Sequence, residues 1–126
     1  MKSVKVIWKA LLEVSSTGVC DLESKAFIKL HRRIGADFLD VLILLKLRNG
    51  SSSGYDIISY IHKRFNILIS SGTVYSCLYH LERDTLIKGK TVQRKRIYTL
   101  TQKGKEKTKT LSNMKTKILA LVADLF

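Results

Sequence analysis

The spacing of apolar residues changes sharply near residue 86, and this change limits the folds open to the chain. Apolar residues recur every three to four positions up to Leu81, whereas apolar and polar residues alternate from Leu86 to Leu100. The first spacing predicts amphipathic helices and the second predicts strands. Residues 86–92 and 96–100 form two alternating runs joined by the basic tripeptide 93–95, which predicts a β-hairpin. A mainly α fold with one small β-hairpin, of the α+β class, follows.

The helical segments before the hairpin have recognisable ends. A first amphipathic helix is expected around Trp8, and a second runs from a cap at Asp21 to just before Gly35. Asp37 is then the expected N-cap of a nearly apolar central helix. Small residues at 49–54 predict a flexible connection to the next helix. A further helix is expected to begin at a cap formed by Ser70 or Ser71.

Length and charge restrict the kind of protein. A chain of 126 residues fits one core with added terminal helices, and 45% hydrophobic residues suffice for that core. The formal net charge of +13 makes a polyanion the expected partner, with DNA, RNA and anionic lipid all open on charge alone. The longest apolar run, residues 38–47, is too short to span a membrane, and the N-terminus does not resemble a signal peptide. A cytoplasmic, nucleoid-associated protein without membrane contact is expected.

The helix expected to begin at Ser70 or Ser71 starts with small polar residues. Such a helix can enter a DNA major groove, where its hydroxyl groups contact phosphates or base edges. The alternative for the serines is a simple capping role, and Tyr75 can belong either to the core or to a phosphate contact. The candidate recognition-helix residues are Ser70, Ser71, Thr73, Tyr75, Ser76, His80 and Arg83.

The hairpin and the start of the last helix concentrate positive charge. A basic hairpin tip suits phosphate contact or insertion into a minor groove, whereas the lysines at 103–109 are expected to face solvent. The candidate wing residues are Lys88, Lys90, Gln93, Arg94, Lys95 and Arg96.

The C-terminal segment carries an apolar stripe with alternating spacings of three and four, which is typical of a helix that pairs with another helix. The stripe consists of Leu111, Met114, Ile118, Leu121 and Leu125. The expected organisation is therefore an N-terminal helical extension (1–35), a winged helix-turn-helix domain (36–101) and a C-terminal dimerisation helix (102–126).

Four short segments occur in the order and at the separations found in one known family. They are Gly54-Tyr55-Asp56-Ile57, Gly72-Thr73-Val74-Tyr75, Leu81-Glu82 and Tyr98-Thr99-Leu100-Thr101 followed by Gly104. Across residues 36–105 the chain resembles the PadR family of transcriptional regulators. It departs from the family pattern at Ser76, where the family often has proline, and at Thr85, where it often has glycine.

The resemblance implies a homodimeric DNA-binding regulator, most often a repressor, acting on an inverted-repeat operator. The alternative is an architectural protein that binds DNA with little sequence preference, and a winged helix used only for protein contacts is a third class. No catalytic, metal or cofactor site is expected, because His31, His62 and His80 lack ligand spacing and no phosphate-binding loop is present. A small-molecule effector stays open. Cys20 and Cys77 match no zinc or redox spacing, which leaves two free thiols or one disulfide.

Overall fold

The computed structural model describes residues 21–126; the helix expected around Trp8, and Cys20, lie outside this range. The elements are α2 (Asp21–Asp37), α3 (Leu39–Arg48), β1 (Ser52–Ser53), α4 (Gly54–Phe65), α5 (Ser71–Arg83), β2 (Ile87–Val92), β3 (Lys95–Leu100), α6 (Gln102–Asn113) and α7 (Lys115–Asp124). The fold is mainly helical with a small antiparallel sheet, as expected.

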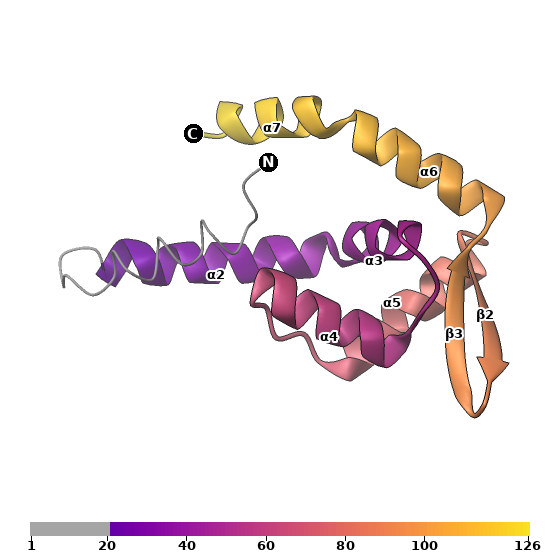
Figure 1. The fold of residues 1–126 in the computed structure, drawn as a ribbon. Coiled ribbons are helices and arrows are strands. Elements are labelled where there is room, and N and C mark those ends of the chain that lie inside the picture. The colour runs from indigo at the N-terminus through magenta and orange to yellow at the C-terminus, as the bar shows by residue number, and fades with distance from the viewer. Residues whose placement is uncertain (1–20) are drawn as a thin grey trace.

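Helix α3 lies at the centre of the molecule (Figure 1). Helices α4 and α5 pack against it, the β2–β3 hairpin closes one end, and α2 extends from the other end. Helix α6 returns along α3, and α7 continues beyond it. The core contains fully buried side chains from α3, α4, α5 and β2, namely Ile43, Leu44, Ile57, Ile61, Val74, Leu78 and Ile87. Their burial is the main source of stability.

Helix α2 runs further than the sequence suggests, and two expectations about its end are wrong. Gly35 lies inside the helix and is buried, and the side chain of Ile67 packs closely against it. Asp37 is the last residue of α2 and not a cap, and α3 begins after Phe38 without a side-chain cap. Helix α2 is anchored by His31, whose Nε2 donates to the carbonyl oxygen of Phe65 at 2.7 Å.

The connection expected to be flexible contains a strand. Ser52 and Ser53 form β1, which pairs antiparallel with β3 opposite Tyr98 and Ile97, and both serines are buried. Ser53 also caps α4: its Oγ accepts from the Asp56 amide at 3.2 Å, and the Asp56 carboxylate accepts from the Ser53 amide at 3.3 Å. This capping box fixes the start of α4. The same hydrogen bonds lower the pKa of Asp56.

The hairpin is confirmed, with a tighter turn than expected. Lys95 belongs to β3 and pairs with Val92, so only Gln93 and Arg94 form the turn. Both have positive φ, 49° and 67°, which matches the two-residue turn that follows the twist of a hairpin. The sheet order is β1-β3-β2.

The C-terminal segment is two helices and not one. The backbone leaves helical geometry at Met114, between α6 and α7. The start of α6 is fixed by Thr101, whose Oγ1 accepts from the Gly104 amide at 3.1 Å. Gly104 is required there because a Cβ atom would collide with the carbonyl oxygen of Leu86. No helix within residues 21–126 is long and apolar enough to cross a membrane.

The backbone conformation at Thr85 shows why the PadR pattern often has glycine at this position. It also leads to a stability prediction. This β-branched residue has φ of 61°, a conformation that glycine adopts without strain and threonine does not. We expect Thr85→Gly to raise the free energy of unfolding by about 1 kcal/mol. Urea denaturation of both proteins measures the difference in the free energy of unfolding. A destabilised variant would show that the threonine side chain stabilises the fold by more than the positive φ costs.

Candidate nucleic-acid interface

Helix α5 presents one apolar and one polar side. Val74, Leu78 and Leu81 are buried in the core, so helical periodicity places Ser76 and Arg83 on the exposed side. Ser70 is confirmed as the N-cap, because its Oγ accepts from the Thr73 amide at 3.2 Å. Ser71, Thr73, Ser76, His80 and Arg83 are all exposed. The helix therefore has a short polar face available to a partner.

Tyr75 lies at the edge of this face and packs on the start of α4. A Cβ atom at position 54 would lie 2.5 Å from Cε1 and 2.7 Å from the hydroxyl oxygen of Tyr75. The ring therefore lies directly over Gly54, while 47% of the residue stays exposed. Tyr75 is thus both packed and accessible, and Gly54 is needed to let the ring approach.

Two further exposed tyrosines lie near this face and were not among the expected residues. Tyr79 is 64% exposed and follows Tyr75 by one helical turn, so helical spacing alone could have identified it. Tyr55 is 75% exposed and adjoins Gly54 at the start of α4. Its relation to α5 follows only from the contact between Tyr75 and Gly54.

The edge of α5 that faces α3 is acidic. Asp37 and Asp40 line a shallow groove together with Thr73, Ser76, Cys77 and His80. Carboxylates repel phosphate, so this edge is unfavourable for a DNA backbone. Glu82, in the last turn of α5, instead contacts the basic hairpin through Arg96, so the charge beside α5 differs between these two places.

Cys77 is a free, half-buried thiol in that groove. Burial, with a smaller contribution from the Asp40 carboxylate, raises its pKa to about 11. Because the unfolded thiol ionises near its ordinary value of 9.0, this group's contribution to stability is complete below pH 9 and is lost between about pH 9 and 11.

The thiol should consequently react slowly. In a Cys20→Ala protein we expect Cys77 at pH 9 to react with a disulfide reagent about tenfold or more slower when folded than in urea, since only the thiolate attacks. Equal rates at pH 9 would show that the folded thiol is neither buried nor shifted.

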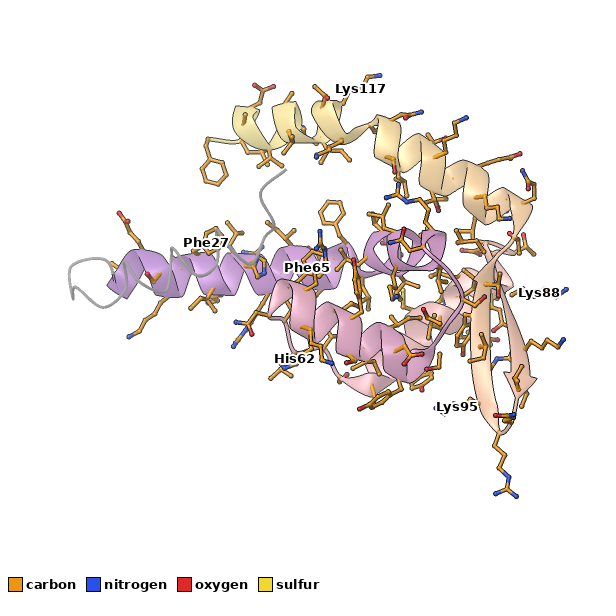
Figure 2. The ribbon with its side chains drawn as sticks, in the orientation of Figure 1. Phe27, His62, Phe65, Lys88, Lys95 and Lys117 are labelled. Atoms are coloured by element: carbon orange, nitrogen blue, oxygen red, sulfur yellow. The ribbon has the colours of Figure 1, made fainter. Side chains whose placement is uncertain are left out.

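The hairpin, or wing, carries its cations on two faces. Register places Lys88, Lys90 and Lys95 on the outer face, away from the buried ring of Tyr98. Figure 2 shows Lys88 and Lys95 projecting from the hairpin. Gln93 and Arg94 form the exposed tip.

Arg96 has a different role from the other wing cations. Its Nη2 lies 2.6 Å from Oε2 of Glu82, and its guanidinium lies over the ring of Tyr98. This ion pair joins the wing to the end of α5. The Glu82 carboxylate raises the pKa of Arg96. Both side chains are partly exposed, so the ion pair contributes little to the free energy of unfolding. Its main effect is to position the wing. It sets the wing at a fixed distance from the polar face of α5.

The expected dimer stripe occupies different environments along its length. Leu111 packs against the core, and Met114 lies at the break between α6 and α7. Ile118 is half-buried, whereas Leu121 and Leu125 are 63% and 74% exposed. Helix α7 has no buried residue, and further apolar side chains are exposed on or beside it, namely Leu119, Val122 and Phe126.

Within residues 21–126, no three histidine, cysteine or acidic side chains are placed to hold a metal ion. The polar face of α5, the tyrosines beside it and the basic wing are the groups that the fold brings together.

The model of the transcriptional regulator PadR-like family matches residues 41–110. No curated protein sequence matches the chain. A transcriptional regulator from Clostridium thermocellum is 26% identical, with a TM-score of 0.63 over 75% of this chain and 94% of that protein.

Two other solved structures are informative. Bacillus subtilis PadR in complex with operator DNA is 32% identical, with a TM-score of 0.53 over 58% of this chain and 44% of PadR. F93 from STIV, a winged-helix DNA-binding protein, is 25% identical, with a TM-score of 0.56 over 67% of this chain and 91% of F93. Since the family match covers more than half of its residues, this chain belongs to the PadR-like family of transcriptional regulators.

Proposed function

We propose that the protein binds double-stranded DNA sequence-specifically as a homodimer and represses transcription from an inverted-repeat operator. The observation that carries the proposal is the exposed polar face of α5, joined to a basic wing by the Arg96–Glu82 ion pair. Hydroxyl groups on a helix can read base edges in the major groove, while the wing cations contact phosphates. The Bacillus subtilis PadR complex with operator DNA supports this use of a related fold.

The apolar surface of α7 supports the homodimer. Ile118, Leu121 and Leu125 recur on one side of a helix that buries no residue within its own chain. Exposed apolar side chains also lie in the second half of α2 and just after it, namely Leu30, Ile34 and Phe38. Large exposed apolar surfaces mark sites of protein association, and a second copy of the chain covers both by symmetry.

Two subunits related by a two-fold axis present two copies of α5. Each copy occupies one half-site, and the half-sites lie about one helical turn of DNA apart. The protein then acts in the cytoplasm, associated with the nucleoid. The net charge of +13 attracts duplex DNA of any sequence, so specificity must come from contacts to bases.

Selection from a random duplex library near physiological salt tests the function. The protein is incubated with the library, and the retained duplexes are sequenced. We expect an inverted repeat to be enriched. Strong retention without any motif would instead support an architectural DNA-binding protein, which the high charge alone would also explain.

A further inference from the structure

A second cavity lies between α3, β3 and α6, apart from the candidate DNA interface. Its volume is about 450 Å³, which falls within the range of small-molecule sites. None of its lining residues belongs to α5 or to the wing tip. They come from the end of α3 and the segment after it, from β3 and from α6.

The lining combines positive charge, hydroxyl groups and an apolar floor. Arg48, Lys105 and Lys109 come from two different helices, and no acidic residue is among the lining residues. Ser51 and Thr99 add hydroxyls that are 3.0 Å apart. The buried side chains of Leu47 and Leu100 form the floor.

Ordinary helix electrostatics accounts for only one of these cations. Arg48 ends α3, where a positive charge is favourable next to the free carbonyl groups. Its Nη1 donates to Ser112 Oγ at 2.6 Å, which holds the guanidinium at the cavity. Lys105 and Lys109 lie within α6, one helical turn apart on the same side, where the helix dipole gives no such advantage. With three cations and no carboxylate among its lining residues, the cavity is a favourable place for an anion.

We propose that this cavity binds a small molecule that carries a phosphate group. Arg48, Lys105 and Lys109 donate to the phosphate oxygens in charge-assisted hydrogen bonds. Ser51 and Thr99, whose hydroxyls are hydrogen-bonded to each other, supply one further donor, and the apolar floor contacts the remainder of the molecule. A multiply charged phosphate suits three cations better than a single carboxylate does.

Titration calorimetry with inorganic pyrophosphate, at an ionic strength held constant with chloride, tests the proposal. We expect one pyrophosphate per chain, and binding about tenfold or more weaker in Lys105→Ala/Lys109→Ala, since each lost bond to a charged group costs at least about that factor. Both lysines are exposed, so the variant is expected to fold. Its unfolding temperature is measured alongside.

Two control variants identify where the anion binds. Lys107→Ala/Lys117→Ala removes the same charge from exposed positions that do not line the cavity, and Arg94→Gly/Lys95→Ala removes it from the wing. Both should bind pyrophosphate within about twofold of the parent protein. Absence of binding to the parent, or an equal loss in any control, would overturn the proposal.

Discussion

Replacement of Ile118 and Leu121 by glutamate is expected to convert the proposed homodimer into monomers. Both positions lie on the apolar side of α7, and a charge placed there must be desolvated when two subunits meet. The two half-sites would then be bound by independent chains. We expect affinity for the full operator to fall by about 100-fold or more, because the second contact is no longer intramolecular. Equilibrium sedimentation and DNA titration measure the two effects.

A matched control separates dimer loss from added negative charge. Thr116→Glu/Ala120→Glu introduces the same two charges on the opposite side of α7, at exposed positions. This protein should remain a dimer and lose only the small part of its affinity that depends on net charge. A monomeric parent protein, or a dimer that survives the Ile118 and Leu121 substitutions, would show that α7 does not join the subunits.

Removal of the wing-tip cations is expected to weaken binding to every duplex. Each phosphate contact contributes about 0.9 to the slope of log affinity against log salt, so Arg94→Gly/Lys95→Ala should reduce the slope by nearly two. At physiological salt the affinity should fall by about tenfold or more. Anisotropy titrations at several salt concentrations give both quantities.

The choice of glycine at position 94 preserves the hairpin. Arg94 has φ of 67°, which glycine adopts more readily than arginine, so a lost affinity cannot be attributed to an unfolded turn. Lys107→Ala/Lys117→Ala changes net charge equally at positions away from the wing. If the two double variants lowered the slope equally, the wing would act only through the overall field and not through contact.

Local sequence signals predicted much of this fold because their causes are local. Alternation from residue 86 gave the hairpin, and Ser70 was one of two residues expected to cap α5. The errors arose where distant residues decide the structure. Gly35 has the local character of a helix stop, but it lies inside α2, where the side chain of Ile67 packs closely against it. Ser52 and Ser53 form a strand of two residues, which is too short to show an alternating pattern of apolar and polar residues. The strand forms because β3 pairs with it.

The sequence predicted the types of residue that form the candidate interface. It did not predict the contacts that these residues make with the rest of the fold. Arg96 was expected to be one more wing cation, whereas Glu82, fourteen residues earlier, holds it as part of the framework. The acidic edge near Asp40 could not be inferred, because it depends on the packing of α3 against α5. Likewise, the position of Tyr75 follows from Gly54 on another helix.

If α5 reads the bases of the operator, a change in one of its exposed side chains must change the DNA sequence that is selected. Selection from the random duplex library should therefore be repeated with Ser76→Asn, which changes one exposed side chain at the middle of the polar face. Asparagine pairs favourably with adenine in the major groove. We expect an inverted repeat that differs from the parent motif at one or two adjacent positions of each half-site. Recovery of the unchanged motif at equal affinity would show that Ser76 does not contact a base.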